Sequence, residues 1–212
     1  MELAKNCAKN LLSIKAIKLS PNQPFTWASG LKSPIYCDNR KTLSYPDMRA
    51  FIRDGLVSII RRYYPDVQVI AGVATGAIAQ GVLVAQELGL PFIYVRSEEK
   101  KHGLTNKVEG VVNKGDKVVV VEDLVSTGQS SLNAAQTLQD MGCNVLGMVA
   151  IFTYNLPIAS QRFAEAKLDL HTLTHYGILV EEAAKEGYIK ENEIEVLNAW
   201  SKDPNAWAEQ HQ

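Results

Sequence analysis

Continuous apolar runs that alternate with segments of helical periodicity constrain this chain most strongly. The runs are VQVIAGV, PFIYV, KVVVV and NVLGMVAIF; AIAQGVLVAQELG and SSLNAAQTLQDMG lie between them, and LPIASQRFAEA, LDLHTL and YGILVEEAAKEG continue the alternation. Strands that are apolar throughout are buried on both faces, as in a parallel sheet covered by its connecting helices. The pattern therefore predicts an α/β fold, a parallel sheet flanked by helices on both faces. Ligands of such sheets bind at the carboxyl ends of the strands.

The region before this alternation is irregular. Apolar residues at helical spacing in MELAKNCAKNLLSIKAIKLS predict an amphipathic helix, and SPNQPFTWASGLKSPIYCDNR is typical of loops and short extended pieces. Pro46 then opens a helix that runs to Tyr63. No repeat or linker interrupts the chain. We expect a single domain over residues 1–212, with an irregular N-terminal addition over about residues 1–45.

The charge balance argues against whole classes of partner. The formal net charge is −1, so no general field attracts nucleic acid or an anionic membrane. No apolar run approaches the roughly 20 residues that span a bilayer, and lysines interrupt the segment where a signal peptide would be apolar. The three cysteines are far apart and form no CxxC pair, as is usual for thiols in a reducing compartment. We expect a cytoplasmic protein that binds neither nucleic acid nor membrane.

Two adjacent acids, Glu122 and Asp123, follow the apolar run KVVVV, and the turn LVSTGQSS follows them. Like charges at the end of a buried strand repel, so they face water or bind something. Gly128 allows a tight turn into a helix whose free amides, with polar side chains from residues 126–130, form a cradle for a phosphate. Carboxylates suit hydroxyls or a metal ion. A phosphorylated pentose meets both demands, whereas helix capping beside a solvated edge is the alternative without a ligand.

A known phosphate loop does not account for this site. The nearest match to a Walker sequence is GVVNKGDK, which places Asp116 where the lysine must be, and no helix follows it. No GxGxxG fingerprint follows a strand.

The second informative stretch is VRSEEKKHGLTNKVEG, between two predicted strands. A segment with so much charge is usually a solvated loop. Its composition also suits the expulsion of pyrophosphate from a sugar carbon, because negative charge then builds on the leaving oxygens. Arg96, Lys100 and His102 would supply cations and a proton source.

These motifs resemble those of a known family. An apolar strand, two acids, two intervening residues and Ser-Thr-Gly resemble the phosphoribosyl pyrophosphate (PRPP) signature of type I phosphoribosyltransferases. The spacing of Arg96, Lys100, His102 and Gly103 resembles the catalytic loop of the orotate-specific branch. In the same branch, FTWASGLKSPIYCDNR resembles the hood over the base, and GVATG the loop on the pyrophosphate side.

The resemblance implies a reaction and its residues. Orotate and PRPP would give orotidine 5′-monophosphate and pyrophosphate, with Mg²⁺, in de novo pyrimidine synthesis. Lys100 and His102 would be catalytic, and Ser126 would also touch orotate. The residues implied for PRPP are Arg96, Lys100, His102, Glu122, Asp123, Leu124, Val125, Ser126, Thr127, Gly128, Gln129 and Ser130. Substrate oxygens and water would hold most of the magnesium shell, so no protein ligand set is expected.

The resemblance also implies a homodimer, in which the loop over residues 96–109 reaches into the neighbour's site. Some positions depart from the family pattern: Ser97, Ala28 and Thr75 stand where basic residues are common. The arginine expected to meet the orotate carboxylate should follow the strand ending at Phe152, but none comes before Arg162. Lys32, Arg40 or main-chain amides remain as substitutes.

Two other functions compete with orotate transfer. A purine-type phosphoribosyltransferase should lack both the FTWASGLKSP segment and the Lys-x-His-Gly loop, and both are present. A regulator that senses a sugar phosphate would add a DNA-binding segment or a basic face and could lose the loop cations, and neither change is visible. The site residues therefore favour the orotate-specific transferase.

Overall fold

A six-stranded sheet forms the centre of the computed structural model, which describes residues 2–27, 29–96 and 107–211. The strands lie in the order β10-β9-β8-β5-β6-β7. They are β5 (Val69–Val73), β6 (Phe92–Val95), β7 (Val108–Glu109), β8 (Lys117–Val125), β9 (Asn144–Thr153) and β10 (Leu170–His175). All neighbours pair in parallel except β7, a short edge strand antiparallel to β6. The predicted parallel sheet is confirmed, with one antiparallel edge that the apolar pattern did not predict.

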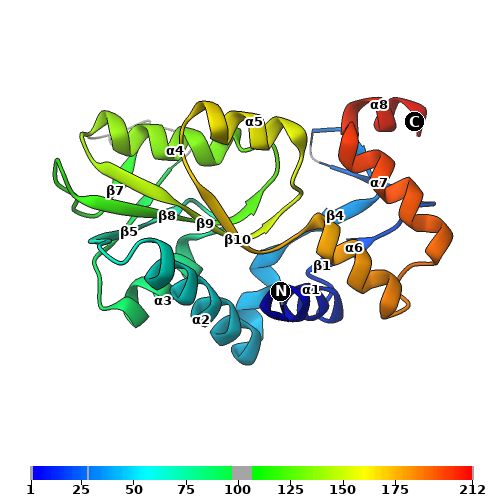
Figure 1. Ribbon diagram of the computed structural model, residues 1–212, viewed down its shortest axis with the longest axis horizontal. Helices are drawn as coiled ribbons and strands as arrows, with labels where there is room; N and C mark the ends of the chain where they lie inside the picture. The colour runs from blue at the N-terminus through cyan, green and yellow to red at the C-terminus, as the bar shows by residue number, and fades with distance from the viewer. Residues whose placement is uncertain (1, 28, 97–106, 212) are drawn as a thin grey trace.

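Helices cover both faces of this sheet (Figure 1). One face carries α2 (Pro46–Tyr63) and α3 (Ile78–Leu88), with α1 (Glu2–Ser13) and α6 (Tyr176–Lys185) beside them, and the other carries α4 (Gln129–Asp140) and α5 (Pro157–Glu165). The valines of β8 alternate between two apolar cores: Val119 and Val121 enter one, Val118 and Val120 the other. This alternation explains why the strand is apolar at successive positions, since both of its sides are buried.

The N-terminal region is more regular than the sequence predicts. Short strands form two antiparallel pairs: β1 (Ile17–Leu19) with β4 (Ile35–Cys37), and β2 (Phe25–Thr26) with β3 (Lys32–Ser33). A 3-10 helix, η1 (Asn39–Ser44), joins them to α2. We call residues 17–37 the hood. The indole nitrogen of Trp27 donates to the carbonyl of Ile35 at 3.0 Å and ties the two pairs together.

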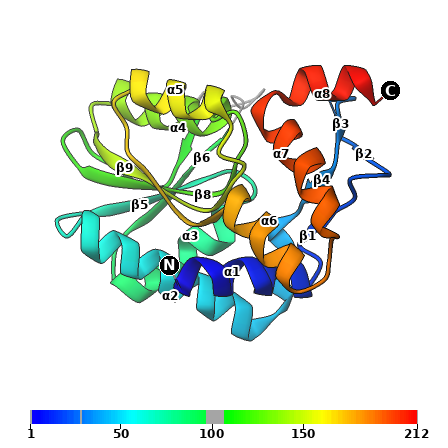
Figure 2. The same cartoon turned by 45° about the vertical axis from the view of Figure 1, so that its right-hand side comes forward.

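The chain ends in elements that the sequence did not predict: η2 (Glu191–Glu193), α7 (Ile194–Lys202) and α8 (Pro204–Gln210). Figure 2 shows α7 and α8 beside the hood strands. Trp200 of α7 is fully buried, and its ring meets Trp27 edge-on at 5.9 Å between centroids. Trp27 in turn stacks on Tyr154 at 5.5 Å. The C-terminal helix α7 therefore packs against the hood through Trp200.

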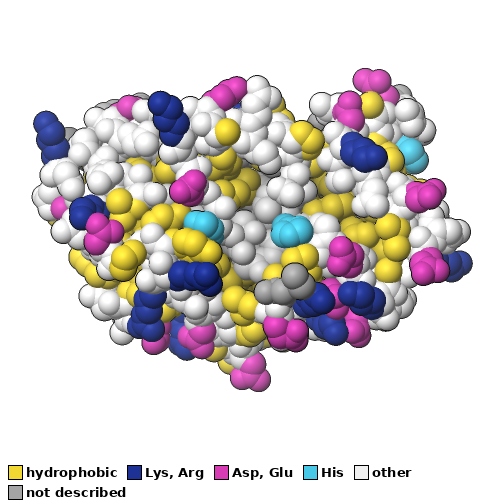
Figure 3. All heavy atoms as spheres, viewed as in Figure 1, with side chains coloured by type: hydrophobic (Ala, Val, Ile, Leu, Met, Phe, Trp, Pro, Cys, Tyr) yellow, Lys and Arg dark blue, Asp and Glu magenta, His cyan; other side chains and the backbone are white. Residues whose placement is uncertain are grey.

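The surface seen in Figure 3 intersperses Lys and Arg with Asp and Glu and shows no field of one sign. This agrees with the near-zero net charge. Among the described residues, no helix is both long and apolar enough to cross a membrane.

Candidate functional site

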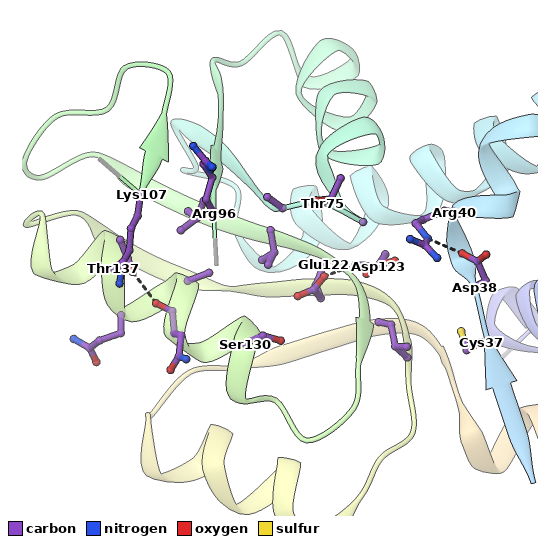
Figure 4. A pocket seen from close by; sticks show the side chains of 18 of the residues that line it. Cys37, Asp38, Arg40, Thr75, Arg96, Lys107, Glu122, Asp123, Ser130 and Thr137 are labelled. Carbon is purple, nitrogen blue, oxygen red and sulfur yellow. Dashed lines mark hydrogen bonds and ion pairs between the residues drawn. The ribbon is translucent and has the colours of Figure 1, made fainter. Parts of the chain in front are cut away.

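A cavity of about 740 Å³ opens where the carboxyl ends of β5, β6 and β8 meet the hood and α4 (Figure 4). Its central strand, β8, runs on through the acid pair to Val125, beyond the predicted apolar run. The residues that line it are Cys37, Asp38, Arg40, Val73, Ala74, Thr75, Gly76, Val95, Arg96, Lys107, Glu122, Asp123, Leu124, Ser130, Asn133, Ala134, Gln136, Thr137 and Asp140. The site lies at the edge of the sheet that the topology predicts.

The two acids are not equivalent. Glu122 is 5% exposed, and both of its oxygens accept hydrogen bonds: Oε2 from the Ser131 hydroxyl at 2.8 Å and Oε1 from the Asp123 amide at 2.9 Å. Burial, and then the charge of Asp123, raise the pKa of Glu122 to about 8. A protonated Glu122 removes the repulsion between adjacent carboxylates. Asp123 is the acid that is more open to the cavity.

Two neighbours place Asp123. Gly76, in the loop after β5, packs directly against its carboxylate, and an added Cβ there would overlap the carboxylate oxygens. Asn39 of η1 is buried, and its side-chain amide donates to the Asp123 carbonyl at 2.6 Å. The Cys37 thiol donates to the Asn39 Oδ1 at 3.4 Å. The hood is thus hydrogen-bonded to the strand that carries the acids.

The predicted phosphate turn is a tight turn into α4. Gly128 has φ +78, a conformation that favours glycine, and an added Cβ would also crowd the Phe163 ring at 3.0 Å. The amides at the start of α4 have no partners within the helix and are available to an anion. Arg162 of α5 donates from Nη1 to the Thr127 carbonyl at 3.0 Å, which brings a positive charge behind the turn.

The other predicted turn residues differ in exposure. Ser130 lines the cavity, Gln129 is exposed and donates to Asn133 Oδ1 at 2.9 Å, and Ser126 is half-buried. Leu124 also lines the cavity. Val125 is fully buried, so only its main chain can serve a ligand.

The cations of the cavity come from two sides. Arg96 and Lys107 lie on one side of the acid pair, and Arg40 lies on the other (Figure 4). Arg96 Nη1 is 3.6 Å from Glu109 Oε1, and its amide donates to the Lys107 carbonyl at 2.8 Å. Arg96 is therefore held at the point where its strand leaves the sheet.

Several predictions fall on residues that the structure does not describe. Lys100, His102, Ser97 and Ala28 lie outside the described ranges. Thr75 is described and lines the cavity beside Gly76, so the position that departs from the family pattern does belong to the site.

One wall of the cavity was not predicted from the sequence. Asn133, Gln136, Thr137 and Asp140 line it from α4. These polar residues recur at intervals of three and four along the helix, and that spacing was available as a signal for a polar face. Asn39 was harder to find, because only the tertiary fold brings η1 to the end of β8; Arg40, one of the substitutes named from the sequence, does line the cavity.

No group of three or more His, Cys, Asp or Glu side chains in the described part of the chain could hold a metal ion. The adjacent carboxyl groups of Glu122 and Asp123 are fewer ligands than Mg²⁺ takes, and this ion commonly completes its shell with substrate phosphates and water. The donor set fits an ion that enters with its substrate.

Comparison with known proteins supplies the class. Residues 45–180, more than half of the chain, match the phosphoribosyl transferase domain family. The chain therefore belongs to the phosphoribosyltransferases.

Its relatives carry a narrower name. The orotate phosphoribosyltransferase of Porphyromonas gingivalis is 57% identical over 205 residues, which is 97% of this chain and 98% of that protein. The orotate phosphoribosyltransferase of Enterococcus faecalis is 50% identical over 206 residues, again 97% of this chain and 98% of the relative. Among solved structures, orotate phosphoribosyltransferase from Aeropyrum pernix is similar with a TM-score of 0.75 at 28% identity, covering 86% of this chain and 99% of that one. Within the family, the chain falls in the orotate branch.

Proposed function

We propose that the protein transfers the 5-phosphoribosyl group of PRPP to orotate, giving orotidine 5′-monophosphate and pyrophosphate in de novo pyrimidine synthesis. The observation that carries this proposal is one cavity that joins an acid pair to a phosphate turn, in a chain 57% identical to an orotate phosphoribosyltransferase. No feature of the described residues favours a purine base or a regulatory role over this reaction.

The cavity suggests how PRPP would lie. The ribose hydroxyls donate to Asp123, with Glu122 behind it, and the 5′-phosphate sits on the turn over residues 126–130. The pyrophosphate extends toward Arg96 and the loop at Ala74–Gly76, which line the same cavity. Ser126 lies near the join of sugar and base, where it would also touch orotate.

Bond cleavage leaves an electron-poor, oxocarbenium-like sugar and a charged leaving group, so the protein contributes positioning and charge stabilisation. Lys100 and His102 are proposed to meet the leaving oxygens, Lys100 as the main catalytic cation. Mg²⁺ would neutralise pyrophosphate charge when it is bound with the substrate.

The assembly and setting are proposed from the family resemblance. The protein would act as a cytoplasmic homodimer in which the loop over residues 96–109 reaches the partner's site. Each copy would function as one domain over residues 1–212, with residues 1–45 forming the N-terminal helix and hood.

An absorbance assay tests the proposed function. The protein is mixed with PRPP, Mg²⁺ and orotate, and the ultraviolet absorbance of orotate is followed; uracil, hypoxanthine and xanthine serve as control bases. We expect the absorbance to fall when orotate is the base and to stay constant with each control base. The proposal would be contradicted if the protein converted a purine base and not orotate, or if it converted none of the four bases.

A further inference from the structure

Orotate differs from uracil by a carboxylate, and a site that prefers orotate must offer this group a cation or several donors. The described cations of the cavity are Arg96, Lys107 and Arg40. Arg96 and Lys107 lie on one side of the acid pair, where the pyrophosphate would lie, whereas Arg40 projects from η1 on the hood side (Figure 4). With the ribose at the acid pair, as proposed above, the base would lie toward Arg40.

The geometry of Arg40 suits an incoming carboxylate. Its Nε donates to Asp38 Oδ1 at 2.7 Å, while 62% of its side chain is exposed. Asp38 thus fixes the direction of the guanidinium through one nitrogen. Five N–H donors are available in a guanidinium, so both terminal nitrogens keep donors for a second, planar partner.

The other candidate cations are engaged elsewhere. Lys32 donates from Nζ to the Thr26 hydroxyl at 3.0 Å and lies near α8, beside Gly30 and Asn205, outside this cavity. Arg162 is bound to the Thr127 carbonyl behind the phosphate turn. Tyr154, which follows β9 where the family pattern places an arginine, is 3% exposed and packed under Trp27.

We infer that Arg40, oriented by Asp38, recognises the carboxylate of orotate and so sets the preference of this enzyme for orotate over uracil. This inference rests on the proposed function, because it assumes that orotate is the base. It assigns to η1, which follows the hood strands, the role that the residue after β9 was expected to fill.

Steady-state kinetics of Arg40→Gln test the inference, with Lys32→Gln as the matched control on the hood. Loss of a charge-assisted hydrogen bond should raise the KM for orotate by about 10- to 100-fold, while the KM for PRPP changes less than about threefold. Because uracil lacks the carboxylate, its residual kcat/KM, far below that for orotate, should stay within about threefold, so the preference for orotate over uracil falls by the same factor as kcat/KM for orotate. Lys32→Gln should leave both KM values near those of the wild type.

Failure of the proposed function and failure of the role of Arg40 give different results in these assays. If the wild type does not consume orotate, the proposed function fails. If the wild type consumes orotate and Arg40→Gln keeps its KM, then Arg40 does not read the carboxylate. A parallel rise in the KM for PRPP would also overturn the inference, because Arg40 would then serve the sugar phosphate. The inference would also fail if Arg40→Gln lowered kcat/KM for uracil as much as for orotate.

Discussion

Replacement of Glu122 by Gln should stabilise the unliganded protein at alkaline pH. The wild-type carboxyl is buried beside Asp123, and these surroundings raise its pKa from 4.5 to about 8. Between these values the unfolded chain has lost a proton that the folded chain keeps, so the stability of the wild type falls as the pH rises. Above about pH 8 Glu122 is ionised in the folded chain as well, and the loss of stability is at its maximum. Gln is neutral at every pH, and it can accept from the Asp123 amide while donating to the Ser131 hydroxyl.

The expected gain in stability follows from the pKa shift of Glu122. One pKa unit corresponds to about 1.4 kcal/mol, so a shift from 4.5 to about 8 gives an upper limit on the order of 5 kcal/mol in the free energy of unfolding. For a protein of this size, 1 kcal/mol moves the melting temperature by roughly 2–4 °C. At this upper limit the variant should therefore melt roughly 10–20 °C higher than the wild type at pH 8.5. The two should nearly coincide at pH 4.5, where the wild-type carboxyl is protonated in the folded chain.

Thermal unfolding at intervals from pH 4.5 to 8.5 measures this difference. Glu165→Gln provides the control, because Glu165 is an exposed glutamate on α5 and its replacement removes the same charge without changing a buried site. The difference in melting temperature for Glu122→Gln should grow with pH. A difference that is constant across the range, or that shrinks toward alkaline pH, would refute protonation of Glu122 in the folded protein.

Three further substitutions test how the site is held. Gly76→Ala should raise the KM for PRPP by about tenfold, because the new methyl displaces the Asp123 carboxylate; an unchanged KM would show that the loop can yield. Asn39→Ala leaves the part-buried Asp123 carbonyl without this partner and should lower the free energy of unfolding by about 1–2 kcal/mol in urea denaturation, and a change below the error of that measurement would count against the bond. Arg162→Ala removes the donor to the Thr127 carbonyl and should weaken PRPP binding by about tenfold in calorimetry, an effect absent if the turn is rigid by itself.

Short-range sequence patterns predicted much of the fold. The helix from Pro46 to Tyr63 was predicted with its observed bounds, because proline fixes its first turn. The apolar run that ends before Glu122 predicted β8 as a strand buried on both faces, because only such a strand places successive valines in a core. The same local logic placed the acid pair and the phosphate turn at the carboxyl end of the sheet.

Features that depend on distant contacts could not be predicted. The short hood strands pair across turns and carry no alternation, so their sequence resembles that of loops. Asn39 becomes important only because η1 lies against β8. The same contact brings Arg40 into the cavity, whereas the sequence named Arg40 only as one of several substitutes. The tail around Trp200 has no apolar run, yet its tryptophan completes a core with Trp27.

The contact between Trp27 and Trp200 has a consequence for synthesis of the protein. A ribosome makes the hood early and α7 late, and domains begin to fold as they emerge. The hood can form its short strand pairs at once, but the tryptophan that supports it from behind is not yet available. The hood, which is proposed to cover the base, is therefore among the last parts of a new chain to reach its final packing. A chain cut short before α7 would keep the acid pair and the turn over residues 126–130 but would lack the support of Trp200 for the hood.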